Sequence, residues 1–331
     1  MSAAAVLSGV AGALPPRLVT NDDLARRLDT SDEWIRSRTG IRQRYWSDTA
    51  ATSDLAVQAG QRALKAADAG SVDLVVLATT TPDHPCPATA PDVAARLGLG
   101  PVAAFDIAAV CSGFVYALAA GCAHITAGLA DSALIIGAET YSTILDPNDR
   151  ATSVIFGDGA GAVVLRRGDS AQPGALLGFD LGSDGSAKDL IMIPGGGSRS
   201  RTTSRSTPVN CYFTMQGRPV FQHAVTRMAA SARAVLDQLN WPAGSIDWFV
   251  GHQANARILH AVAEDLGIAA HRALLDLDRV GNTSAASIPL ALSRAAADGL
   301  LRPGERLLLS AFGGGLTWGS SALIWPDLTT G

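Results

Sequence analysis

The same order of structural elements occurs twice along this chain. Each copy has a buried strand, a helix, a short strand, a polar junction, a long alanine-rich helix, a strand, a glycine-rich turn and a closing strand. The first copy runs from VDLVVLATTTPDHP (72–85) to FGDGAGAVVL (156–165), and the second from IDWFVGHQANARI (246–258) to TWGSSALIW (317–325). Alternating strands and helices predict an α/β architecture with helix-covered sheets. The repeat favours an internal duplication, and a chance likeness between two generic α/β runs is the alternative.

The duplication predicts where the two halves meet. With 331 residues the chain can form one large or two moderate domains, and we expect halves at 1–170 and 171–331. Alignment of the two copies puts Val110–Cys111 opposite Val280–Gly281, so that Cys111 and Asn282 lie at nearly equivalent junctions. Two central helices related by a pseudo-two-fold axis would bring these junctions into one pocket. The GHQAN turn, with His252, should end at the same level.

Composition and motifs narrow the class of protein. A net charge of −4 gives no electrostatic case for a nucleic-acid partner. Four cysteines without paired short spacings predict neither a disulfide framework nor a zinc site, and a reducing cytoplasm is the simplest location. GxSxG, HExxH and phosphate-loop motifs are missing, and FGDGAGA (156–162) does not fit a dinucleotide site.

Two apolar segments raise the question of a membrane. The N-terminal AAVLSGVAGALPP lacks the basic start of a signal peptide and is typical of a first strand. The run 110–130 has the length of a membrane span, but it is built on alanine and glycine and contains His124. We therefore expect a buried central helix and no membrane partner.

A cysteine lies where the extended segment PVAAFDIAAV (101–110) gives way to this helix. Unpaired N–H groups and the helix dipole at such an end stabilise a thiolate, which predicts a Cys111 pKa lowered from about 8.5 towards neutrality. The same N–H groups could hold an oxyanion. The position suits a nucleophile that forms a thioester. The alternative is a small buried core cysteine, which is what we expect of Cys122.

Two further polar residues strengthen the catalytic interpretation. His252 ends a buried strand in VGHQANARI, and Asn282 precedes a second helix of small residues in RVGNTSAAS. A lone histidine is more often structural. A cysteine, a histidine and an asparagine at three strand-to-helix junctions together indicate a site for acyl transfer.

Six motifs, taken in order, resemble the β-ketoacyl-[acyl-carrier-protein] synthase III family. They are TSDEWIRSRTGIR (30–42), CSGF (111–114), FGDGAGAVVL (156–165), GHQANARI (251–258), GNTSAAS (281–287) and FGGGLTWG (312–319). The resemblance implies a thiolase fold, in which duplicated halves stack as five αβαβα layers, and a homodimer.

The resemblance also implies roles for the three polar residues. Cys111 would take an acyl group from acyl-CoA. His252 and Asn282 would bind the thioester carbonyl of a malonyl unit on the acyl carrier protein and stabilise the enolate formed as carbon dioxide leaves. The enolate would then attack the acyl thioester. The backbone N–H groups of Cys111 and Gly314 would hold the tetrahedral oxyanion.

The same resemblance places acyl-CoA as a substrate, with no permanently bound cofactor or metal. The adenine would stack between Trp34 and Arg150, and Arg38 would face the phosphates. Phe221 and Asn255 would line the pantetheine tunnel. In the alternative interpretation Trp34 is a surface anchor, and Arg38 and Arg150 pair with carboxylates.

Carrier-protein docking and the acyl pocket complete the expected site. Arg257 and Arg218 would form the basic rim for the acidic carrier protein, and Gln222 stands where some relatives have lysine. Cys86 and Phe156 would line the acyl pocket. Cys86 replaces a phenylalanine that in some relatives reaches across the dimer, so we expect room for a longer, branched or aromatic starter.

Three functions are weighed for this site. The first is decarboxylative condensation that initiates fatty-acid or polyketide synthesis. The second is acyl transfer to an amine, a hydroxyl or a carrier protein without condensation. The third is a non-catalytic scaffold, which would have no reason to keep Cys111.

Overall fold

Two sheets form the frame of the molecule in the computed structural model, which describes residues 3–203 and 209–328. The strand order of the first sheet is β1 (Ala3–Ala13), β7 (Gly159–Asp169), β6 (Ser132–Glu139), β4 (Leu74–Ala78) and β5 (Ala103–Ile107). Strand β4 runs parallel to β5 and β6, whereas β7 is antiparallel to β6 and β1. The N-terminal segment expected as a strand is therefore confirmed.

The second sheet repeats this pattern. Its order is β11 (Trp248–Gly251), β12 (Arg306–Gly313), β13 (Thr317–Ile324) and β8 (Leu176–Ser183). Strands β11 and β12 are parallel, and the other pairs are antiparallel. Two small sheets pair β2 (Arg17–Thr20) with β3 (Gln43–Trp46) and β9 (Ile191–Met192) with β10 (Thr214–Met215).

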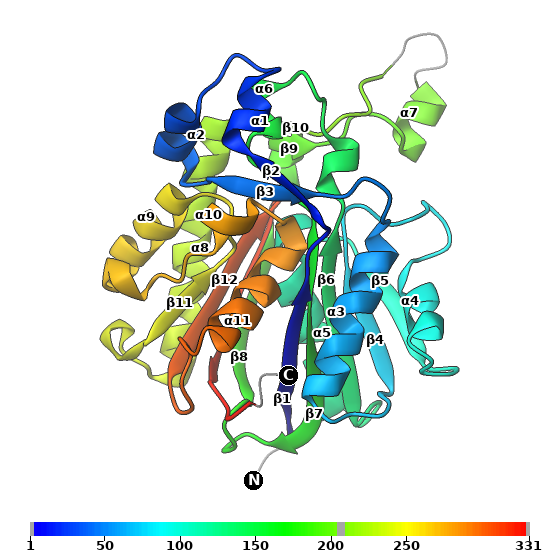
Figure 1. The fold of residues 1–331 in the computed structure, drawn as a ribbon. Coiled ribbons are helices and arrows are strands. Elements are labelled where there is room, and N and C mark those ends of the chain that lie inside the picture. The colour runs from blue at the N-terminus through cyan, green and yellow to red at the C-terminus, as the bar shows by residue number, and fades with distance from the viewer. Residues whose placement is uncertain (1–2, 204–208, 329–331) are drawn as a thin grey trace.

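Helices occupy three layers around the two sheets (Figure 1). Helices α5 (Gly113–Thr126) and α11 (Ser287–Ala297) lie between the sheets, where a shared apolar cluster joins them to both. Helices α3 (Thr52–Ala66) and α4 (Ala90–Arg96) cover the outer face of the first sheet, and α8 (Gly217–Leu239) and α9 (Ala256–Leu266) cover that of the second. The fold has the five αβαβα layers that the resemblance implied.

Short helices complete the chain. They are α1 (Asn21–Ala25), α2 (Asp32–Thr39), α6 (Arg150–Ser153), α7 (Ser198–Thr203) and α10 (Leu277–Val280), with 3₁₀ turns η1 (Val110–Ser112), η2 (Tyr141–Ile144), η3 (Gly185–Leu190), η4 (Ala243–Ser245), η5 (Ala270–Arg272) and η6 (Ser284–Ala286). Within the described stretches, no helix is long and apolar enough to cross a membrane. The apolar helix α5 has 14 residues.

Strand registers reveal how the two halves correspond. Leu74 pairs with Ala133 in the first sheet and Trp248 pairs with Leu307 in the second, so residues 174 positions apart occupy matching places. The same spacing relates η1 to η6 and the start of α5 to the start of α11. Cys111 therefore matches Ala285.

The expected alignment of Cys111 with Gly281 is wrong by four residues. The reason is a helical turn, α10, which the second half carries between the strand bridge at Ala273 and η6. The first half goes from β5 to η1 through only two residues. Because of this extra turn, Asn282 lies just before η6, whereas Cys111 lies within the matching turn η1.

Candidate active site

Cys111 lies in η1, between the end of β5 and the start of α5. The preceding residue, Val110, has a φ of 47°, a left-handed conformation that non-glycine residues seldom adopt. The cysteine is 8% exposed, and its own backbone N–H acts to lower the pKa of the sulfur. The thiol is thus placed at the helix N-terminus, as predicted.

The prediction that the pKa of Cys111 is lowered is wrong for the folded chain. Burial raises the pKa of this thiol to about 12, and the negative charge of Glu139 adds to the increase. The neighbouring Ser284 side chain and the cysteine's own N–H act in the opposite direction without outweighing burial. Cys111 is therefore a thiol at neutral pH, and its activation requires a proton acceptor.

His252 follows β11 directly and is held by a serine from the second central helix. Its Nδ1 lies 2.7 Å from Ser287 Oγ, which also accepts a hydrogen bond from the Gln253 N–H at 3.2 Å. Among the described residues the serine proton has no other acceptor, so we assign it to Nδ1. Burial lowers the pKa of His252 to about 3, so the imidazole is neutral. Its proton is then on Nε2, the nitrogen free for a substrate carbonyl.

Asn282 is fixed at both backbone and side chain. Its N–H donates to the Ile155 carbonyl at 2.9 Å, and its carbonyl accepts from the Gly157 N–H at 2.9 Å. Its Oδ1 accepts from the Ser284 N–H at 2.8 Å. With the oxygen engaged in this way, the Nδ2 amide is the group left to donate to a ligand.

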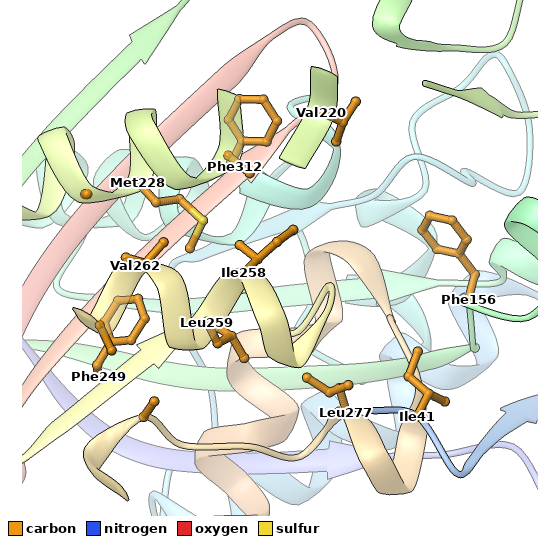
Figure 2. Packing of buried hydrophobic residues seen from close by; sticks show 14 of the residues in the cluster. Ile41, Phe156, Val220, Met228, Phe249, Ile258, Leu259, Val262, Leu277 and Phe312 are labelled. Atoms are coloured by element: carbon orange, nitrogen blue, oxygen red, sulfur yellow. The ribbon is translucent and has the colours of Figure 1, made fainter. Parts of the chain in front are cut away.

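One narrow cavity joins these three residues. Its walls contain Cys111, His252 and Asn282, and the remainder is apolar: Phe156, Ile191, Phe213, Met215, Val220, Ala224, Met228, Ala254, Ile258 and Phe312. Figure 2 shows several of these wall residues within one buried cluster, contributed by α8, α9 and β12. The cavity volume is about 40 Å³. An apolar, constricted space beside a thiol suits a short acyl chain, unlike the longer, branched or aromatic starter expected from Cys86.

The two residues expected in the acyl pocket differ in position. Phe156 lines the cavity and stacks on Tyr141 with 4.4 Å between ring centroids. Cys86 is exposed and does not line the cavity of the single chain. A contribution from Cys86 would therefore have to come across an interface between two chains, as the resemblance implied.

A wider pocket of about 620 Å³ lies close to this cavity: Val220, Ala254 and Ile258 line the cavity, and their chain neighbours Phe221, Asn255 and Arg257 line the pocket. Of the expected CoA and carrier-protein residues, this entrance pocket is lined by Trp34, Arg38, Arg218, Phe221, Gln222, Asn255 and Arg257. Arginine gives this mouth a positive charge, which suits phosphates and acidic partners.

Arg150 lies beside this pocket but is already engaged. Its guanidinium carbon lies 4.9 Å from the Trp34 ring centroid, and its Nη1 donates to the Asp29 carbonyl at 2.6 Å. A base stacked between them would need a separation of about 7 Å. The two residues are thus adjacent as expected, but Arg150 must move outward before adenine can enter.

Asn255 has a local structural task as well. Its Oδ1 caps α9 by accepting from the Arg257 N–H at 2.9 Å, and its Nδ2 donates to the Arg38 carbonyl at 3.0 Å. One amide hydrogen is left over for a pantetheine chain. Asn255 therefore links α9 to α2 at the pocket wall.

The glycine turn between β12 and β13 rests against the nucleophile. A Cβ on Gly313 would lie 2.7 Å from the Cys111 N and 3.0 Å from the Ser112 N, so only glycine permits this contact. Gly314 follows directly, and its N–H as an oxyanion donor stays a prediction. Within the described stretches, no group of three or more His, Cys, Asp or Glu side chains could hold a metal ion.

Sequence reasoning missed three supporting residues. Ser284 and Ser287 lie inside the GNTSAAS motif but had no assigned role, and Glu139 ends β6 without any motif signal. A polar residue within an otherwise apolar strand, in ALIIGAE (133–139), was the available hint of a buried function for Glu139.

The fold and the cavity define a thiolase-fold enzyme that transfers acyl groups through a cysteine. Comparisons with known proteins agree. Residues 105–185 match the family model "3-Oxoacyl-[acyl-carrier-protein (ACP)] synthase III", and residues 236–325 match the model of its C-terminal part. The chain belongs to the β-ketoacyl-[acyl-carrier-protein] synthase III family and is an acyltransferase-type condensing enzyme.

Individual relatives cover almost the whole chain. "Beta-ketoacyl-[acyl-carrier-protein] synthase III 5" of Streptomyces coelicolor is 74% identical over 330 residues, covering 99% of both chains. The crystal structure of the 3-oxoacyl-(acyl carrier protein) synthase III of Pseudomonas aeruginosa PAO1 superposes with a TM-score of 0.94 at 52% identity, covering 98% of this chain and 99% of that one. A priming β-ketosynthase of a polyketide pathway gives 0.91 at 32% identity, covering 98% and 97%.

Proposed function

We propose that this enzyme loads an acyl group from acyl-CoA onto Cys111 and condenses it with malonyl-acyl carrier protein. The observation that carries the proposal is the shared cavity. A cysteine thiol, a neutral imidazole with its proton on Nε2 and an amide with its oxygen already engaged all line the same apolar space. Two hydrogen-bond donors beside a nucleophile suit a reaction in which charge develops on a thioester oxygen.

The first half-reaction uses the thiol and the backbone around it. The Cys111 sulfur attacks the acyl carbonyl, and the N–H groups of Cys111 and Gly314 hold the oxyanion. The bond from carbon to the CoA sulfur then breaks, and CoA leaves through the pocket lined by Trp34 and Phe221. Acyl-CoA is a substrate here, and no permanently bound cofactor takes part.

The second half-reaction uses His252 and Asn282. Their Nε2–H and Nδ2–H donate to the malonyl thioester oxygen. The bond to the carboxylate breaks, carbon dioxide leaves, and the electron pair forms an enolate that the two donors stabilise. The enolate carbon attacks the acyl-Cys111 carbonyl, and the sulfur is expelled as a thiolate that takes up a proton from solvent. The product is a β-ketoacyl thioester two carbons longer than the starter.

Further properties belong to the same proposal. Arg218 and Arg257 dock the acidic carrier protein at the entrance. The enzyme acts in the cytoplasm as a homodimer, in which Cys86 of one chain reaches the acyl pocket of the other. Strand β5 supports a dimer because it is an edge of the first sheet and can pair with a second copy.

A division at residues 170 and 171 is also part of the proposal. Strands β1 and β4 to β7 of the first sheet come from residues 1–170, and the four strands of the second sheet come from residues 171–331. The halves are not independent, because α11 packs against β1 and β7 of the first.

Intact-protein mass spectrometry tests this function. The enzyme is incubated with acyl-CoAs from acetyl to octanoyl, with branched and aryl forms, and then receives malonyl-acyl carrier protein. We expect an adduct that is discharged as a β-ketoacyl product. Cys111→Ala should abolish the adduct, whereas Cys122→Ala, which removes another buried thiol, should keep it. An adduct that malonyl-acyl carrier protein leaves untouched would instead support transfer without condensation.

A further inference from the structure

Glu139 is a buried carboxylate for which the condensation mechanism above has no use. It ends β6, is 0% exposed and accepts all its hydrogen bonds from uncharged groups. These donors are the Thr80 N–H at 3.0 and 3.1 Å, the Thr81 hydroxyl at 2.9 Å, the Ser284 hydroxyl at 3.0 Å and the Thr79 hydroxyl at 3.4 Å. A buried carboxylate held without a cation is costly and calls for a reason.

Ser284 connects this carboxylate to the nucleophile. The serine opens η6, which packs against η1; its hydroxyl donates to Glu139 at 3.0 Å and is near enough to the Cys111 thiol to lower its pKa. A hydroxyl has a single proton. Since that proton points to the Glu139 carboxylate, the serine oxygen is the acceptor for the Cys111 S–H. The resting arrangement is therefore S–H to O–H to carboxylate.

The backbone at Ser284 is held in an unusual conformation to make this connection. Its φ is 50°, in the left-handed region that seldom accommodates a side chain with a Cβ. Strain of this kind is retained where the surrounding structure enforces it, and it occurs preferentially at functional sites. The matching residue of the first half, Val110, has the same backbone but no hydroxyl.

We propose that Ser284 and Glu139 form a proton relay that accepts the Cys111 proton as the sulfur attacks the acyl thioester. This inference rests on the proposed function, since it describes the loading step of the same site. In this relay Ser284 accepts the proton from the sulfur, and Glu139 acts through it as the terminal proton acceptor.

The relay balances over one loading cycle. The Cys111 S–H proton moves to the Ser284 oxygen while the serine proton moves to Glu139, and the sulfur–carbon bond forms. When the tetrahedral intermediate collapses, the bond from carbon to the CoA sulfur breaks. The proton on Glu139 returns through Ser284 to that sulfur. CoA leaves as a thiol, and Glu139 is again a carboxylate.

The surroundings of Glu139 suit a proton acceptor. Burial raises the pKa of Glu139 to about 7, so it is partly ionised near neutrality. The titratable groups that interact with it are Cys111 from η1 and Tyr141 from η2. Burial raises the pKa of Tyr141 well above its usual value, which keeps it neutral. The loop after β4 contributes threonines, and η6 contributes Ser284, all uncharged.

The pH profile of Cys111 acylation tests the relay, with single-turnover rates measured by mass spectrometry. We expect the wild-type rate to rise with pH and level off above about 7, where Glu139 is ionised. In Glu139→Gln the plateau should be lost, and the rate at pH 7.5 should fall by about 10²-fold or more. Ser284→Gly, which tolerates the positive φ, should give a similar loss. The double variant should be no slower than either single variant, because each substitution alone already interrupts the same proton transfer from Cys111 to Glu139.

Two further variants separate the relay from a structural role. Thr81→Val removes a hydrogen bond to the ionised carboxylate, so the pKa of Glu139 rises and the plateau should begin at higher pH. Asp158→Asn is the matched control: Asp158 is another fully buried carboxylate, but it bonds Ser47 and Ser142. Its plateau should stay at the wild-type pH.

If Glu139 has only a structural or electrostatic role, the Glu139→Gln substitution should change the acylation rate in the opposite direction. Removing its charge would lower the pKa of Cys111 and leave acylation as fast or faster. A folded Glu139→Gln enzyme with an unchanged profile, or additive losses in the double variant, would overturn the relay while wild-type acylation still supported the proposed function. If the wild type takes up no acyl group at all, the proposed function fails and the relay with it.

Discussion

The Ser287 hydroxyl is the part of the site whose removal best tests the assignment of His252. It donates to His252 Nδ1 at 2.7 Å and accepts from the Gln253 N–H at 3.2 Å, and all three residues are buried. Ser287→Ala leaves a ring nitrogen and a backbone N–H without this partner. Each buried group that loses its partner costs about 1–3 kcal/mol, so the free energy of unfolding should fall measurably.

The chemical consequence should be selective. Without the serine proton on Nδ1, the imidazole is no longer held with its own proton on Nε2, and the donor to the malonyl thioester oxygen is lost for part of the time. We expect condensation to slow about 10- to 100-fold, which corresponds to about 1.4–2.7 kcal/mol of transition-state stabilisation. Acyl loading should continue near the wild-type rate, because His252 has no part in the relay from Cys111.

Two single-turnover measurements separate these steps. Loading is followed as mass added to Cys111 from acyl-CoA, and condensation as discharge of preloaded enzyme by malonyl-acyl carrier protein. Ser321→Ala is the matched control: this serine is 0% exposed, and its hydroxyl has no hydrogen-bond partner among the described residues. A folded Ser287→Ala enzyme that condenses at the wild-type rate would refute the tautomer argument. If Ser287→Ala slowed loading and condensation equally, the claim that Ser287 and His252 act only in condensation would be refuted.

Three further predictions follow from the entrance and from burial. Trp34→Ala should raise the KM for acyl-CoA about five- to 150-fold through lost base stacking, but not the KM for an acyl-N-acetylcysteamine, which has no adenine; equal effects in steady-state kinetics would exclude stacking. Arg257→Glu should lower kcat/KM for malonyl-acyl carrier protein about tenfold at low ionic strength, less at high salt, with malonyl-CoA as the comparison substrate; a salt-independent loss would argue against electrostatic docking. The pKa of His252 is lowered to about 3 in the folded chain. Below pH 6.5 this histidine therefore binds a proton in the unfolded chain but stays neutral in the folded chain. Wild-type stability should then fall as pH drops from 6.5 to 5, by about 2 kcal/mol more than that of His252→Gln in urea unfolding; parallel curves would contradict a neutral imidazole.

Much of this architecture could be predicted because it is encoded locally. Strand β4 is a run of five buried apolar residues, and α2 begins where the Ser31 hydroxyl accepts from the Trp34 N–H. Such signals lie within a few residues of the elements they define. The placement of Cys111, His252 and Asn282 at one cavity was also predicted. Cys111 and His252 follow strands β5 and β11 as expected, whereas Asn282 follows the helical turn α10 in place of the expected strand.

The parts that could not be predicted depend on contacts between distant segments. The pKa of Cys111 is set by burial and by Ser284 and Glu139, both far away in the chain. The segment 193–211 is dominated by Gly, Ser, Thr and Arg, which predicts an exposed loop whose Arg199, Arg201 and Arg205 could meet an acidic partner, yet it contains the short helix α7 (Ser198–Thr203). Its Arg205 lies outside the described residues. Arg150 covers Trp34 because of its contact with Asp29, which no local pattern indicates.

The duplication itself explains why one site forms where symmetry would allow two. Residues 174 positions apart match, so the places of Cys111 and His252 are taken in the other half by Ala285 and Ala78. The place of Glu139 is taken by Gly313, next to the Cys111 N–H.

This exchange has opposite effects at the two matching places. On one side a carboxylate reaches Ser284, and on the other a missing side chain leaves the backbone of Cys111 open to the turn that carries Gly314. A side chain at Gly313 would clash with the Cys111 N, and a glycine at 139 would leave Ser284 without its acceptor. Each half has therefore lost what the other keeps, and a single asymmetric site between them is the outcome.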